Sequence, residues 1–211
     1  MRIATIAPLG ILLLGSFASM RAQDPVPASQ VAIAYMGTSV STSDTTGVCM
    51  WYPVLFGDLD LPSLFATPLF GTPAVDKEHA YLIWVSDFKV QVLQPKDFKN
   101  IDFLGLITAG SGTIYFTDRP DLRDWRDWTN RSTWGQPVAR FIRRAGLFPS
   151  ADGGYSANLT STAELVSSTT FTWNGKQFNF RELIPHGMTC SETAVGDAEV
   201  GTCVAVGVGW L

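Results

Sequence analysis

The residues with the most distinctive chemistry lie in one segment, residues 118–144. It holds seven of the ten arginines of the chain and three of its seven tryptophans. Guanidinium groups bind carboxylates through paired hydrogen bonds, and Trp and Arg dominate binding hot spots. The segment therefore predicts a recognition surface for a glycan or an anionic small molecule. Its candidate ligand-binding residues are Arg123, Trp125, Arg126, Trp128, Arg131 and Trp134.

The same segment is open to a structural interpretation. Four aspartates recur at every third position between the arginines, from Asp118 to Asp127. A lattice of Asp–Arg pairs, with Trp rings packed on guanidinium planes, would tie a short helix to the rim of the fold. Exposed ion pairs contribute only about 0–1 kcal/mol each, so this lattice would set geometry more than stability.

Catalytic chemistry has fewer candidates. His186 lies in a Pro-His-Gly loop and is the best-placed acid–base group, because loops carry function more often than cores. Together with carboxylates of the Asp118–Asp127 run, it would serve a secreted enzyme acting on a carbohydrate or a small ester. Ser111 lies outside any Gly-x-Ser-x-Gly pattern, and no phosphate-loop motif is present. The sequence thus favours a binding or structural module over an enzyme and predicts no cofactor.

The three cysteines predict one disulfide. Cys190 and Cys203 enclose a polar, glycine-rich stretch that we expect to be a loop. In an exported protein they are expected to form a bond, which would stabilise the fold by about 3 kcal/mol. Cys49 is then either a buried free thiol or the true partner of one of the other two. The spacing of His186 and the cysteines matches no zinc motif, so no metal site is predicted.

The N-terminus has the pattern of a signal peptide, assigned to residues 1–22. One positive charge at Arg2 precedes an apolar run that is too short to span a bilayer, and small residues follow. Cleavage is expected after Ala18 or Ala22, which makes the protein secreted or periplasmic. The mature chain then carries 13 basic and 19 acidic residues. It therefore has no basic surplus for binding nucleic acid or an anionic membrane.

Residues 23–30 are expected to form a flexible lead-in. After them, apolar and polar residues alternate with a period of two, and turn residues separate these runs. The strongest signal is Asn174-Gly175, which predicts a two-residue hairpin whose Phe171, Trp173, Phe178 and Phe180 share a core face. A second hairpin is expected within residues 105–116, and residues 37–47 are expected to form a loop. Strands are predicted at residues 31–36, 48–56, 79–85, 88–92, 138–147 and 204–208.

These elements predict a single all-β domain over residues 31–211, an antiparallel β-sandwich or β-barrel. One short helix is expected near residues 118–129, where Asp118 could cap the first turn and Pro120 suits it. A small outer-membrane barrel is a further alternative, since export and strand content fit it. The cysteines and the lack of repeated ten-residue alternating strands favour a protein that does not insert into a membrane.

Overall fold

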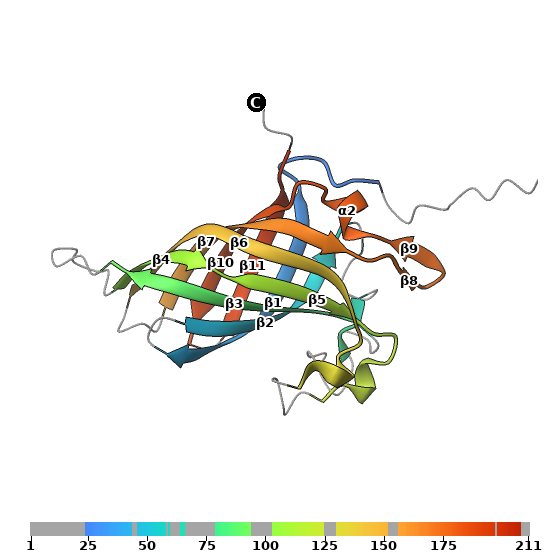
Figure 1. Ribbon diagram of the computed structural model, residues 1–211, viewed down its shortest axis with the longest axis horizontal. Helices are drawn as coiled ribbons and strands as arrows, with labels where there is room; N and C mark the ends of the chain where they lie inside the picture. Colours follow the sequence, from blue (N-terminus) through green and yellow to red (C-terminus); the bar gives the residue numbers. More distant parts are fainter. Residues whose placement is uncertain are drawn as a thin grey trace, which may run out of the picture.

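The computed structural model describes residues 24–43, 46–57, 59, 64–65, 79–93, 103–124, 130–151, 156–196 and 198–207. The predicted signal peptide lies outside these ranges. Among the described residues, no helix is both long and apolar enough to cross a membrane. Most of these residues belong to one antiparallel sheet that closes into a barrel (Figure 1).

The barrel is a meander in which strands that follow one another in sequence mostly pair in space. The strand order is β2-β1-β11-β10-β7-β6-β4-β3-β5, and the sheet closes because β2 also pairs with β3 and β5 with β6. The all-β prediction is confirmed, and the barrel alternative is the correct one. In chain order the strands are β1 (Val31–Ser43), β2 (Thr46–Phe56), β3 (Leu82–Val92), β4 (Phe103–Ala109), β5 (Ser111–Phe116), β6 (Gln136–Ala151), β7 (Ser156–Ser168), β8 (Phe171–Trp173), β9 (Lys176–Phe178), β10 (Met188–Val195) and β11 (Ala198–Ala205).

Gly110 interrupts one strand of the barrel. β4 and β5 run in line, and each pairs with β3 on one side and β6 on the other. The predicted hairpin within residues 105–116 was therefore wrong. A Cβ at Gly110 would lie 2.5 Å from the Asp87 carbonyl oxygen, so the glycine permits a close backbone approach here. The eight strand positions around the barrel are thus β1, β2, β3, β4 with β5, β6, β7, β10 and β11.

Two stretches that we expected to be loops are strands. β1 continues to Ser43 and β2 begins at Thr46, so most of residues 37–47 is paired. The stretch between Cys190 and Cys203 is the β10–β11 hairpin. In both stretches, pairing across the barrel overrides the low strand propensity of glycine and small polar residues.

The predicted disulfide is confirmed. Cys190 and Cys203 lie directly opposite each other on β10 and β11 and are bonded, whereas Cys49 is a buried free thiol. A structural disulfide indicates that the chain matures in an oxidising compartment.

One end of the barrel is plugged by the connection between β7 and β10. The β8–β9 hairpin forms as predicted, with positive φ angles of 49° at Asn174 and 74° at Gly175. It is followed by the one-turn helix α2 (Phe180–Leu183), which the sequence patterns did not predict. The four aromatic side chains expected on the core face are all buried: Phe171, Trp173, Phe178 and Phe180. Both elements lie together at one end of the barrel (Figure 1).

Two long connections cover the outer face of the barrel near β3 and β5. Trp134 is fully buried, with its ring 5.8 Å from that of Tyr115. Arg123 is also buried and donates a hydrogen bond to the Ala80 carbonyl at 2.6 Å. Arg123 thereby joins the β5–β6 connection to the end of the β2–β3 connection.

Only part of the expected helix near residues 118–129 falls within the described residues. The structure describes a single 3-10 turn there, η2 (Pro120–Leu122), whose N-cap is Arg119 and not Asp118. A second such turn, η3 (Arg131–Thr133), follows, and residues 125–129 lie outside the described part of the chain. Proline does occupy the first turn of η2, as the sequence predicts.

The barrel interior holds a layer of large aromatic rings, each opposite a glycine. A Cβ at Gly201 would lie 2.6 Å from the Tyr35 ring, and one at Gly112 would lie 2.3 Å from Trp84 Nε1. The rings of Trp51 and Trp84 are 4.9 Å apart, and that of Tyr35 is 5.1 Å from Trp51. The inward-facing glycines therefore make the room that these rings fill, and the interior is packed at this level.

Candidate functional site: a charged cluster and cavity inside the barrel

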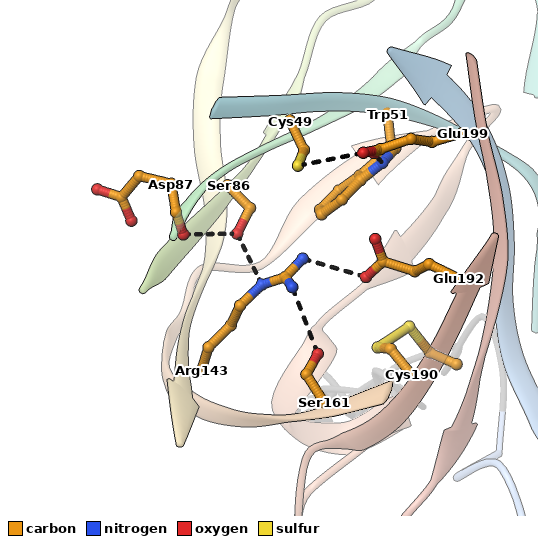
Figure 2. Close-up of polar contacts among 10 residues, drawn as sticks. Cys49, Trp51, Ser86, Asp87, Arg143, Ser161, Cys190, Glu192 and Glu199 are labelled. Carbon is orange, nitrogen blue, oxygen red and sulfur yellow. Dashed lines mark hydrogen bonds and ion pairs between the residues drawn. A yellow bond between two sulfur atoms is a disulfide. The ribbon is translucent and has the colours of Figure 1, made fainter. Parts of the chain in front are cut away.

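Three charged side chains project into the barrel and form what we call the interior charge cluster: Arg143, Glu192 and Glu199. They come from β6, β10 and β11, and their exposed fractions are only 3%, 3% and 7%. Figure 2 shows Arg143 facing Glu192, while Glu199 faces Cys49 and Trp51 of β2. Charged groups are almost never fully buried unless they are paired, so the contacts within this cluster decide what it can do.

Arg143 is held on several sides. Its guanidinium donates to Ser86 Oγ at 3.1 Å, to Ser161 Oγ at 3.4 Å, and to Glu192 Oε1 at 3.1 Å. It also lies 5.0 Å from the Trp51 ring centre, within the range of a cation–π contact. Despite the cost of burial, its negative neighbours raise the pKa of Arg143, so the group stays charged.

Glu199 is held by two donors from β2. Trp51 Nε1 donates to its Oε2 at 2.5 Å, and the Cys49 thiol donates to its Oε1 at 3.7 Å. Both contacts suit an ionised carboxylate, which can only accept hydrogen bonds. Burial and the nearby Glu199 charge raise the pKa of the Cys49 thiol, which makes it a donor and a poor nucleophile.

Glu192 is held by two groups from other strands. Its Oε1 accepts from Arg143 at 3.1 Å, and its carboxyl group also hydrogen-bonds with the Tyr35 hydroxyl. Burial, the Glu192 charge and this hydrogen bond raise the pKa of the Tyr35 phenol. Burial also raises the pKa of Glu192 to about 6, which Arg143 and the Tyr35 hydrogen bond partly oppose. Glu192 is therefore an anchored, buried carboxyl group whose charge depends on pH.

Next to the cluster lies a largely enclosed cavity of about 130 Å³. It extends from the carboxylates towards Gly196, at the turn that joins β10 to β11, and so lies away from the plugged end. More of its exposed wall is polar than apolar, because Cys49, Glu192 and Glu199 line it together with apolar side chains. The lining residues are Ser39, Cys49, Phe88, Ile107, Ala157, Leu159, Glu192, Ala194, Gly196 and Glu199.

None of the described residues that were predicted to form a recognition surface lines this cavity. Arg123 and Trp134 are buried, and Arg123 donates to the backbone carbonyls of Ala80 and Tyr81. Arg131 is partly exposed, with its guanidinium 5.9 Å from the Trp134 ring. Trp125, Arg126 and Trp128 lie outside the described residues. The ligand-binding role of all six residues stays a prediction.

His186 lies at the opposite end of the barrel from the cavity. It is exposed in the turn after α2, at the plugged end, and it does not line the cavity. Among the described residues, no group of three or more His, Cys, Asp or Glu side chains could hold a metal ion.

Sequence reasoning missed Glu192 and Glu199 because it placed them in a loop. A signal was nevertheless present, because a disulfide between paired strands fixes their register. With Cys190 opposite Cys203, Glu192 lies opposite Gly201, and alternation puts Glu192, Glu199 and both cysteines on one face. That face is the barrel interior.

The pKa of Glu192 predicts a pH-dependent stability. Because folding raises this pKa from the usual 4.5 to about 6, the protein gains stability from protonated Glu192 below pH 4.5 and loses it as the pH rises through 6. The difference corresponds to about 2 kcal/mol. Urea unfolding between pH 4 and 7.5 should show this loss in the wild type relative to Glu192→Gln. A constant difference between the two proteins across that range would contradict it.

Comparison of the chain with protein-family models, with curated proteins and with solved structures found no match.

Proposed function

We propose that this protein is an exported binding protein that holds a small protonated amine inside its barrel. The observation that carries the proposal is the buried Glu192 carboxyl, which is anchored by Arg143 and the Tyr35 hydroxyl and lines the cavity together with Glu199. A buried acceptor of this kind gains most from a ligand that donates hydrogen bonds.

The charge of the cluster favours a cation over other donors. Above pH 6, two carboxylates face one guanidinium, and Arg143 is already bonded to Glu192 and to two serine hydroxyls. One negative charge is then left without a balancing cation in a low-dielectric interior. A protonated amine would supply both the missing charge and the hydrogen-bond donors.

The cavity sets the size and shape of the ligand. Its volume of about 130 Å³ is close to that of an apolar cavity of about 150 Å³ that can bind benzene. Phe88, Ile107 and Leu159 also line the cavity, so they would pack against a short hydrocarbon body. These features favour a primary amine with about four to six carbon atoms.

The experiment is isothermal titration calorimetry at pH 7.5 with three ligands of one shape: n-butylamine, n-butanol and butyrate. We expect n-butylamine to bind at least tenfold more tightly than n-butanol, and butyrate not to bind. Glu192→Gln should weaken n-butylamine binding at least tenfold, as should lowering the pH to 5, because either change removes the negative charge.

The matched control is Glu164→Gln, an exposed carboxylate on the outer face that pairs with Arg144. It should leave n-butylamine binding unchanged. Binding of butyrate in preference to the amine would overturn the proposal. So would an affinity for n-butylamine that Glu192→Gln does not change, or the absence of binding by all three ligands.

A further inference from the structure

A second hollow lies on the outer face of the barrel, across β5, β6 and β7. It has a volume of about 450 Å³, within the usual range for small-molecule sites. Its lining contains two guanidinium groups, five hydroxyl-bearing Ser and Thr side chains, and no carboxylate. The lining residues are Ser111, Thr113, Tyr115, Arg131, Pro137, Val138, Ala139, Arg140, Ser167, Ser168 and Thr169. We call it the outer groove.

The strand register places Arg140 at the centre of the outer groove. Thr113 on β5 and Ser167 on β7 lie opposite Arg140 on β6, one on each side. Arg140 is exposed, and within the described part of the chain no carboxylate or carbonyl oxygen accepts a hydrogen bond from its guanidinium. A cation with hydroxyl groups on both flanks is thus presented to solvent without a fixed partner.

Arg131 reaches the same groove from a different element. It begins the η3 turn, and its guanidinium lies 5.9 Å from the ring of the fully buried Trp134. The Trp134 ring in turn packs edge-on against Tyr115, a lining residue. This packing holds the Arg131 guanidinium at the rim of the groove.

Two carboxylates on neighbouring strands are already paired, one of them with Ser111 of the groove itself. Glu164 on β7 pairs with Arg144 at 2.6 Å, and Asp87 on β3 accepts hydrogen bonds from the backbone and side chain of Ser111. The groove is therefore locally cationic on a chain whose net charge is −4. Such a local reversal of charge attracts anions.

We infer that the outer groove binds a carboxylated sugar, a uronic acid, through Arg131 and Arg140. A guanidinium group matches a carboxylate with two parallel hydrogen bonds, which a single sugar carboxylate could accept from either arginine. The hydroxyls of Thr113, Ser167 and Thr169 can both donate to and accept from ring hydroxyls, whereas those of Ser111 and Ser168 are already hydrogen-bonded within the protein. A plain inorganic anion would use the arginines but not these hydroxyls.

The test is calorimetric titration of the full chain with D-glucuronate, D-glucose and sodium sulfate at pH 7.5 in 150 mM salt. We expect glucuronate to bind at least tenfold more tightly than glucose or sulfate. Arg140→Gln and Arg131→Gln should each weaken glucuronate binding at least tenfold. Arg144→Gln removes an exposed arginine from the same strand outside the groove, so it should have no effect.

Any one of the following results would overturn the inference. Equal binding of sulfate and glucuronate would show that only charge is recognised, and equal binding of glucose would show that the arginines are not used. Failure of the Arg140 and Arg131 variants to weaken binding would place the ligand elsewhere. Because the outer groove and the interior cavity share no lining residue, Glu192→Gln should leave glucuronate binding intact.

Discussion

Replacing Arg143 with methionine is expected to lower the free energy of unfolding by about 3–5 kcal/mol. The variant leaves Glu192 without its ion-pair partner and removes the only cation of the interior charge cluster. Two carboxylates would then share a buried site, where each opposes the ionisation of the other. Chemical denaturation at pH 7.5 measures the loss.

Two further variants separate charge from packing in this experiment. Arg144→Met changes the neighbouring exposed arginine and should alter stability far less than Arg143→Met, because its pairing with Glu164 is exposed. The double variant Arg143→Met with Glu192→Leu should recover part of the loss, since an apolar pair can replace a buried ion pair. A cost of less than 1 kcal/mol for Arg143→Met alone would show that the cluster does not support the fold.

Phe180→Ala is expected to cost about 3–5 kcal/mol. Phe180 is 1% exposed, and its ring centre lies 5.0 Å from that of Phe56 on β2 and 6.1 Å from that of Phe141 on β6. It therefore joins α2 to two strands on different sides of the barrel. Truncation would leave a void among rings that cannot easily collapse into it.

The control for this prediction lies in the same helix. Glu182 is exposed, and Glu182→Ala should change the free energy of unfolding by less than about 0.5 kcal/mol. Urea unfolding followed by Trp fluorescence compares both variants with the wild type. If Phe180→Ala costs less than 1 kcal/mol, α2 does not act as the plug of the barrel.

Local signals in the sequence predicted local structure well. Asn174-Gly175 specifies a hairpin by its backbone requirement alone, and Cys190 with Cys203 predicted a disulfide from export and separation. Gly110 was misleading because a glycine between apolar runs fits either a turn or an interrupted strand. Which of the two forms depends on the neighbouring strands β3 and β6, which pair with both halves and come from elsewhere in the chain.

The candidate site was harder to predict than the fold. Arg143 is one of seven clustered arginines, and alternation on the predicted strand 138–147 places it on the opposite face from Arg140 and Arg144 without showing which face is inward. The distinction comes from alternation on β6, which turns Arg143 inward and its neighbour Arg144 outward. The partners of Arg143 lie on β3, β7 and β10, up to 57 residues away, so only the closed barrel brings them together.

Closure of the sheet also determines how this molecule can meet another protein. Each strand of the barrel pairs with a neighbour on both sides, so its backbone N–H and C=O groups are largely satisfied within the chain. Open sheets can recruit a partner by adding a strand along a free edge, a mode in which the backbone supplies much of the affinity. Strand addition is not available along the paired strands of this barrel. A protein partner of the barrel therefore has to be recognised through side chains on its outer surface.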